Sequence, residues 1–212
     1  MKKWIVIGLV IVVLIGLGVI ATPLFLFRAM HVPTGAMANT IIPGDGFWAK
    51  RWVGEIKRGD IVIFEPPSNR KVLFVMRVIG MPGESIQFRG KKVLIDGEEL
   101  PERRAIIELP TESDHGLLKE SSHEGEGKYT ALYTTESWNA TDGAIYSGMK
   151  FGVAAPFQIP SGHYFVLGDS RDNSMDSRFW GPVPENQIKA KPYIIYSSKE
   201  PSHLFAKLEI NP

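Results

Sequence analysis

The apolar run at the N-terminus constrains this chain more than any other feature. Residues 4–27 carry no charged side chain and are rich in Ile, Val, Leu and Gly. A helix rises about 1.5 Å per residue, so a run of this length crosses a hydrocarbon core about 30 Å thick. A cleavable signal peptide is the competing interpretation, but its apolar region spans only about 7 to 15 residues. The sequence therefore predicts one retained transmembrane helix over residues 4–27.

The basic residues around this run predict its orientation. Lys2 and Lys3 precede the run, and only Arg28 follows it closely. The positive-inside rule then places residues 1–3 in the cytoplasm and everything after about residue 28 on the periplasmic or extracellular side of a bacterial-type inner or plasma membrane. The lipid bilayer is accordingly an expected partner.

Composition excludes several other classes of function. The formal net charge of +1 gives no reason to expect nucleic acid. The five histidines are scattered along the chain and there is no cysteine, so neither a metal site nor any other cofactor is predicted. The oligomeric state is left open.

The body of the chain reads as mostly β. Short apolar runs broken by turn residues predict strands at 47–52, 60–64, 72–79, 85–88, 92–95, 129–134, 151–157, 164–167 and 192–196. Asp96-Gly97 is a hairpin turn signal. Between residues 102 and 147 the composition shifts to acidic residues, Ser, Thr, Gly and His, which indicates an inserted, loop-rich region. The core domain would then comprise residues 28–101 and 148–212.

Residues 168–181, GDSRDNSMDSRFWG, carry the densest set of polar groups. Arg171 and Arg178 are expected to pair with Asp169, Asp172 and Asp176 and to hold this loop in one shape. The alternative for the segment alone is a solvated, salt-bridged surface turn.

Three further blocks give the segment a context: MHVPTGAMANTI at 30–41 followed by Gly44-Asp45, KRGDIVIF at 57–64, and MRVIGMPGES at 76–85. With residues 168–181, these blocks in this order resemble the type I signal peptidases. Those are membrane-anchored serine endopeptidases that cut signal peptides from exported preproteins. The resemblance implies a mainly β, antiparallel core with a smaller inserted domain, and preprotein signal peptides as partners.

In that family a nucleophilic serine in the first block works with a lysine base in the third. The resemblance places these two roles at Ala36 and Met76. Alanine has no nucleophilic atom, and a thioether is not a useful base near neutral pH, so little or no activity is predicted. Lys71, the nearest lysine, is expected to point to the opposite side of its strand.

The resemblance also implies supporting roles. Thr34 matches a hydroxyl that helps bind the oxyanion, and a turn hydroxyl bonded to its own backbone is the alternative. Ser174 matches a residue that hydrogen-bonds the lysine, with Asp176 and Arg178 as an ion pair behind it. Met37 is expected in an apolar wall of the substrate groove, or as an ordinary membrane-proximal apolar residue. The same scaffold includes Asp169, Arg171 and Asp172.

Three explanations of the two substitutions remain open. The chain is a natural non-catalytic member that binds exported or surface-polymer subunits as a chaperone or assembly factor, a deliberately inactivated enzyme, or an enzyme that uses other residues. Loss of the nucleophile leaves a serine protease only the residual rate from binding and the oxyanion hole.

Overall fold

The computed structural model describes residues 25–108, 117–140 and 148–208, with a few positions nearer the N-terminus. Most of the predicted transmembrane run lies outside these residues. Among those described, no helix is long and apolar enough to cross a membrane.

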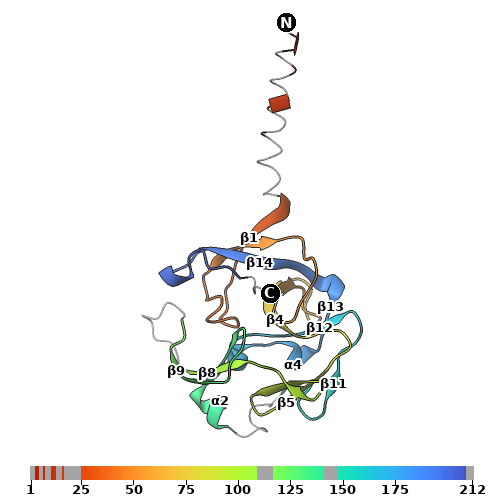
Figure 1. Ribbon diagram of the computed structural model, residues 1–212, viewed down its shortest axis with the longest axis vertical. Coiled ribbons are helices and arrows are strands. Elements are labelled where there is room, and N and C mark those ends of the chain that lie inside the picture. Colours follow the sequence, from red (N-terminus) through yellow and green to blue (C-terminus); the bar gives the residue numbers. More distant parts are fainter. Residues whose placement is uncertain are drawn as a thin grey trace.

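A seven-stranded antiparallel sheet forms the centre of the molecule (Figure 1). Its order is β1-β2-β14-β3-β4-β12-β13. The bounds are β1 Phe27–His31, β2 Gly46–Lys50, β3 Ile61–Phe64, β4 Phe74–Gly80, β12 His163–Leu167, β13 Val183–Pro184 and β14 Ile188–Ser197. Side chains alternate between its two faces, so β3 sends Ile61 and Ile63 to one apolar cluster and Val62 and Phe64 to the other.

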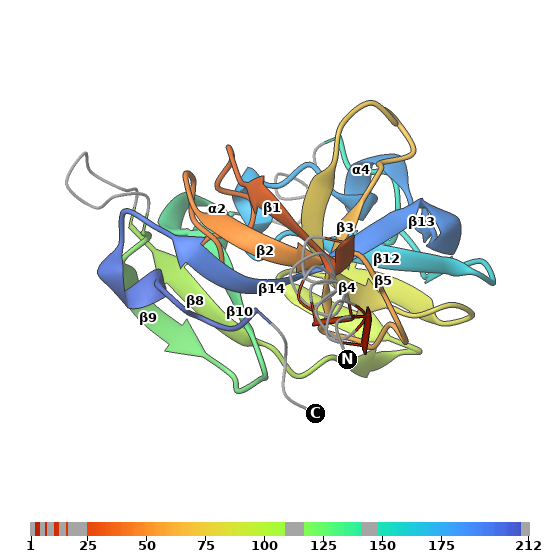
Figure 2. The ribbon, with the colours of Figure 1, turned by 90° about the horizontal axis from the view of Figure 1, so that it is seen from above.

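Two smaller sheets flank the large one on different sides (Figure 2). The first has the order β11-β5-β6-β7, from Phe157–Gln158, Ser85–Arg89, Lys92–Ile95 and Glu98–Glu99. The second has the order β10-β8-β9, from Thr130–Thr134, Arg103–Ile107 and Glu120–Glu124, with β10 and β8 parallel. The described short helices are α2 Thr135–Asn139, η2 Arg171–Asn173, α4 Ser177–Trp180, η3 Glu185–Gln187 and η4 Pro201–His203.

The mainly β prediction is confirmed. Eight of the nine expected strands coincide with observed ones over most of their length, and the hairpin turn forms because Asp96 and Gly97 both take positive φ angles, 51° and 87°. The strand expected at 151–157 is wrong for most of its length, and only β11 remains. Gly152 has a φ of 79° there, which no regular strand accommodates.

The region expected to be loop-rich, 102–147, contains more regular structure than its composition suggested. Its described part holds β8, β9, β10 and α2. All five residues of β9 are exposed, so this strand shows no apolar alternation that the sequence could reveal. The described part of this region is therefore a small sheet beside the large one, and its role as an insertion stays a prediction.

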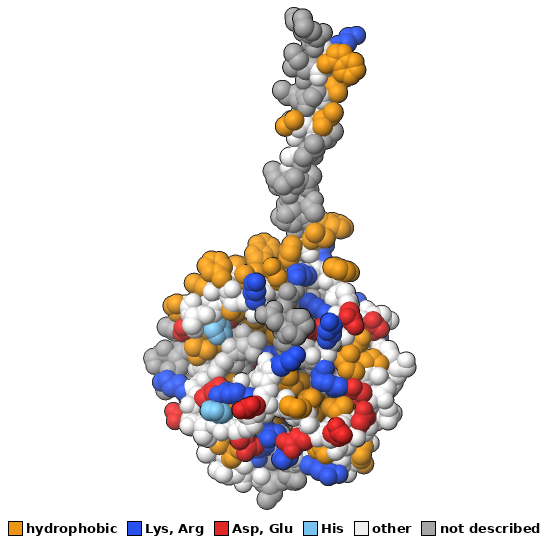
Figure 3. All heavy atoms as spheres, viewed as in Figure 1, with side chains coloured by type: hydrophobic (Ala, Val, Ile, Leu, Met, Phe, Trp, Pro, Cys, Tyr) orange, Lys and Arg blue, Asp and Glu red, His pale blue; other side chains and the backbone are white. Residues whose placement is uncertain are grey.

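Apolar side chains gather at the end of the body where residue 25 enters (Figure 3). Phe25 and Trp52 are mostly exposed, and the Arg51 amide donates to the Leu26 carbonyl at 2.9 Å, which joins these residues into one surface. Trp48, on β2, extends this patch and packs against Tyr196.

Candidate functional site

The polar segment 168–181 is buried rather than solvated. It leaves the end of β12 and forms η2 and then α4, and all of its charged and hydroxyl side chains except Asp172 are buried. The interpretation as a solvated surface turn is therefore wrong. Buried charges require close partners, because transfer of an unpaired ion out of water costs several kcal/mol.

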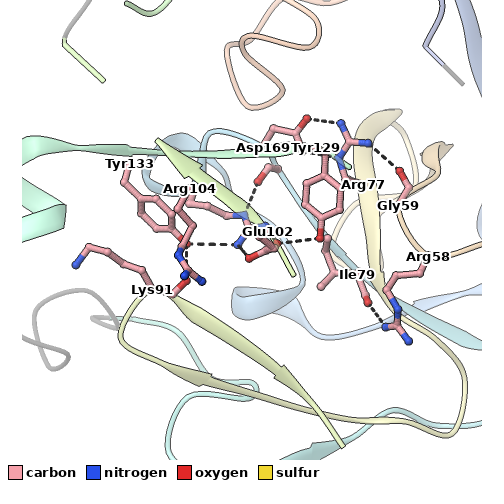
Figure 4. Close-up of polar contacts among 12 residues, drawn as sticks. Arg58, Gly59, Arg77, Ile79, Lys91, Glu102, Arg104, Tyr129, Tyr133 and Asp169 are labelled. Carbon is pink, nitrogen blue, oxygen red and sulfur yellow. Dashed lines mark hydrogen bonds and ion pairs between the residues drawn. The ribbon is translucent and has the colours of Figure 1, made fainter. Parts of the chain in front are cut away.

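Asp169 finds its partner outside the segment. Arg77 on β4 donates from Nε to Oδ1 at 2.7 Å and from Nη2 to Oδ2 at 2.6 Å (Figure 4). The Thr40 hydroxyl donates to the same carboxylate at 2.6 Å. Burial alone would lower the pKa of the Arg77 guanidinium, but the Asp169 charge reverses this and raises it. Asp169 thus ties the segment to the residue after Met76 and to the turn that contains Ala36.

Arg171 also pairs with a residue that the sequence did not suggest. Its guanidinium is fully buried and donates to the Glu102 carboxylate. Figure 4 shows that this carboxylate also accepts from the Tyr129 hydroxyl, at 2.9 Å. The expected pairing of Arg171 within its own segment is wrong. Burial and then the Glu102 charge raise the pKa of Tyr129 well above its usual value. Glu102 lies 69 positions away and had no sequence signal.

Asp176 and Arg178 do form the expected ion pair. Arg178 Nε donates to Asp176 Oδ1 at 2.8 Å and Nη2 donates to Oδ2 at 2.9 Å. The same Nη2 reaches the Arg171 carbonyl at 2.6 Å, so the pair also fixes η2. Asp172 contacts the inserted sheet instead. Its carboxylate accepts from the Thr134 amide at 2.7 Å and so anchors the segment to β10.

Ala36 lies in a turn that packs directly on this segment. Its carbonyl accepts from the Ser170 amide at 3.0 Å. A Cβ atom placed on Gly168 would lie 2.6 Å from that carbonyl and 2.4 Å from Ser174 Oγ. Only a residue without a side chain fits at position 168, and the close approach brings Ala36, Gly168 and Ser174 together.

Met76 is directed to the same place by strand register. In β4, Val78 pairs with Val166 and Arg77 with Leu167 of β12, so Met76 comes next along β4, towards Gly168. Its side chain is 3% exposed and packs in an apolar cluster with Val62. If this register is continued by one residue, Met76 lies beside Gly168, on which the Ala36 turn also packs.

The Ser174 hydroxyl is the unusual polar group of this site. It is buried and has no hydrogen-bond partner among the described residues. Such a group normally has one, because a buried unsatisfied hydroxyl costs about 1–3 kcal/mol. Neither the Met76 thioether nor the Ala36 methyl group offers a good one.

Replacement Ser174→Ala is expected to leave stability unchanged or to raise it by about 1 kcal/mol, because it removes an unsatisfied hydroxyl. Ser177→Ala is the matched control. Ser177 is also buried, but its Oγ accepts from the Val166 amide at 3.0 Å, so its loss is expected to cost about 1 kcal/mol or more. Urea unfolding measures both, and equal destabilisation by the two variants would show that Ser174 has a partner.

The structure also shows where three other residues considered in the sequence lie. Thr34 is exposed two residues before Ala36, and Lys71 is exposed in the turn before β4, outside the strand. Met37 is 1% exposed and packs inside an apolar core cluster with Ile41 and Phe47. Met37 is therefore a core residue in this structure, and its expected role in the wall of a substrate groove stays a prediction.

Neither Ala36 nor Met76 contributes a nucleophile or a base to this site, and the Ser174 hydroxyl is its one polar side-chain group without a partner among the described residues. The carboxylates and guanidinium groups around it are engaged with one another, and packing and register place Ala36, Met76 and Ser174 around Gly168. No group of three or more His, Cys, Asp or Glu side chains in the described parts of the chain could hold a metal ion.

Comparisons with known proteins identify the family of this chain. The family model described as "Signal peptidase, peptidase S26" matches residues 1–197. A signal peptidase I from Pseudomonas fluorescens is 30% identical over 209 residues, covering 85% of this chain and 69% of the relative. The corresponding protein of Aquifex aeolicus is 29% identical over 84% of this chain and 79% of its own length.

A signal peptidase I from Rickettsia massiliae is likewise 30% identical, over 83% of this chain and 74% of the relative. Among solved structures, a signal peptidase I from Enterococcus faecalis has a TM-score of 0.40 at 22% identity, over 66% of this chain and 98% of the other. Because the family model matches residues 1–197, most of this chain, the chain belongs to the signal peptidase family, peptidase S26. It is a homologue of the type I signal peptidases.

Proposed function

We propose that this protein binds the signal peptides of exported preproteins without cutting them, or cuts them only at a residual rate. The observation that carries the proposal is the buried Ser174 hydroxyl, which has no partner among the described residues and lies beside Gly168, where the Ala36 turn packs and the β4 register leads to Met76. This is the environment expected when a lysine base and a serine nucleophile are both replaced while the surrounding frame is kept.

An open strand edge supports the binding half of the proposal. β12 pairs with β4 only from Arg77 to Gly80, so Phe74, Val75 and Met76 have no strand on that side among the described residues. Val72 and Leu73 precede them and are partly exposed. An extended peptide can add to such an edge through its backbone, with small side chains near Ala36.

The apolar patch at the entry of residue 25 supports a position at a membrane. Trp48 and Trp52 have the amphipathic rings that favour a membrane–water interface. We propose that residues 4–27 anchor the chain, that residues 1–3 are cytoplasmic and that the β body lies on the periplasmic or extracellular side.

Binding without cleavage is the expected result when the full chain in detergent is mixed with a fluorescein-labelled signal peptide that ends in Ala-Gln-Ala before a mature segment. Anisotropy should rise, whereas mass spectrometry should find the peptide intact. Leu73→Arg places a charge beside the open edge and is expected to weaken binding roughly tenfold. Leu204→Arg, at similar exposure elsewhere, is the control.

Two outcomes would contradict the proposal. Cleavage at a rate typical of an enzyme would show that other residues act as nucleophile and base. No rise in anisotropy would remove the binding function, and the family fold would then serve another purpose. Equal loss of binding in the Leu73 and Leu204 variants would move the peptide away from the open edge.

A further inference from the structure

Asn39 joins the turn that contains Ala36 to the inserted sheet. Its Nδ2 donates to the Leu118 carbonyl at 2.8 Å, and its Oδ1 accepts from the Leu118 amide at 2.7 Å. One side chain therefore pairs with both backbone groups of a single residue, as a neighbouring strand does in an antiparallel ladder. The contact links two segments that lie 79 positions apart in the sequence.

Leu118 is a firm point of attachment in the inserted sheet. It lies two residues before β9, and its side chain packs against the apolar cluster that β8 and β10 form. The carbonyl of the next residue, Lys119, accepts from the Glu108 amide at 2.9 Å. Asn39 is therefore bonded to a backbone that the sheet already holds in place.

The inserted sheet is itself held against the segment 168–181. The Leu132 amide on β10 donates to the Asp169 carbonyl at 2.7 Å. The hydroxyl of Ser137, on the helix α2 that follows β10, donates to the Asp172 carboxylate at 2.8 Å. Because these bonds come from neighbouring elements, they fix the sheet and the segment relative to each other.

The turn 36–40 is thus attached to two elements that do not move independently. Ala36 and Thr40 are bonded to the segment 168–181, whereas Asn39 is bonded to the inserted sheet. Contacts to the segment alone would let the turn tilt about the segment. The contact between Asn39 and Leu118 removes this freedom because it lies on a separate element.

We propose that Asn39 is a positioning residue of the peptide site. By binding Leu118 it holds the turn, and with it Ala36, at a fixed separation from the open edge of β4. The inserted sheet is then a support of the site, and it sets the room left for a small side chain of a bound peptide. The effect on peptide affinity rests on the proposed function, whereas the position of the turn does not.

The position of the turn is tested without any peptide. The chain has no cysteine, so Ala36→Cys introduces a single thiol at a half-buried position, and its rate of alkylation by N-ethylmaleimide reports how often the turn opens. The measurement uses the full chain in detergent at one pH. Adding Asn39→Ala is expected to speed the alkylation roughly tenfold, because two hydrogen bonds that hold the turn are lost.

Gln158→Ala is the matched control. Gln158 lies on β11 in the other small sheet, where its Nε2 donates to the Gly83 carbonyl at 2.5 Å. Its replacement also removes a bond between a side-chain amide and the backbone, but the alkylation rate is expected to stay unchanged. Urea unfolding of each variant separates positioning from stability. If Asn39→Ala lowers the free energy of unfolding and leaves the alkylation rate unchanged, or if the control speeds alkylation equally, the proposal is overturned.

Peptide binding is measured separately, in the chain with Ala36 intact. Asn39→Ala is expected to weaken the affinity for the labelled signal peptide roughly fivefold, because the turn is no longer held in the binding position. If the unmodified protein does not bind the peptide, the proposed function fails and the alkylation rates still decide the role of Asn39. If the unmodified protein binds and Asn39→Ala binds equally well, Asn39 does not position the peptide site.

Discussion

The double variant Ala36→Ser, Met76→Lys is expected to cleave a preprotein that the unmodified protein leaves intact. The Ala36 turn packs on Gly168 and the continued β4 register brings Met76 beside it, so a hydroxyl at one position and an amine at the other would occupy one small site. In a comparable serine protease, loss of the nucleophile or its base costs roughly 10⁶-fold in kcat. A gain of at least about 100-fold over background is therefore expected even if the geometry is imperfect.

The introduced lysine should find a ready partner. Ser174 Oγ is buried and has no hydrogen-bond partner in the part of the chain that the structure describes. Accepting a hydrogen bond from the amine would orient the base and satisfy the hydroxyl. Burial among apolar residues lowers a lysine pKa, and only the neutral amine can take the serine proton. Activity should consequently rise as pH rises through that lowered pKa, and then level off.

Cleavage of a purified preprotein, followed by gel and mass spectrometry, measures this gain. Each single variant is expected to stay at background, because one lacks the base and the other lacks the nucleophile. Circular dichroism checks that Met76→Lys still folds, since it introduces a charge into an apolar cluster. If the double variant folds and binds the signal peptide but does not cleave it, the two positions do not form a dyad in this fold.

The sequence predicted the strands around this site better than the ion pairs that join its residues. β3, β6 and β12 were found because they are short, continuous apolar runs bounded by turn residues. The partners of Asp169 and Arg171 were not found, because Arg77 and Glu102 lie 92 and 69 positions away and no local pattern marks such pairs. The exposed strand β9 was missed for a related reason: its pairing with β8 decides its structure, and its own residues do not.

Replacement Glu102→Gln is expected to destabilise the protein by about 3–5 kcal/mol, a large part of the stability of an ordinary domain. The change leaves the Arg171 guanidinium charged and fully buried without its counter-ion. Glu99→Gln is the matched control, because Glu99 pairs with Lys92 and Arg104 at a more exposed position. Its loss is expected to cost no more than about 1 kcal/mol. Urea unfolding of the two variants gives the comparison.

The effect should also reach the proposed peptide site, because Arg171 holds the segment that carries Ser174. Its Nε donates to the Gly168 carbonyl at 3.2 Å, and its own carbonyl accepts from Arg178. Signal-peptide binding should weaken in Glu102→Gln under conditions where the protein remains folded. Replacing both partners, Glu102→Leu with Arg171→Met, should recover much of the stability, since an apolar pair leaves no buried charge. Equal losses of unfolding free energy in Glu102→Gln and Glu99→Gln would contradict this prediction. They would mean that the buried ion pair between Glu102 and Arg171 does not stabilise the segment 168–181.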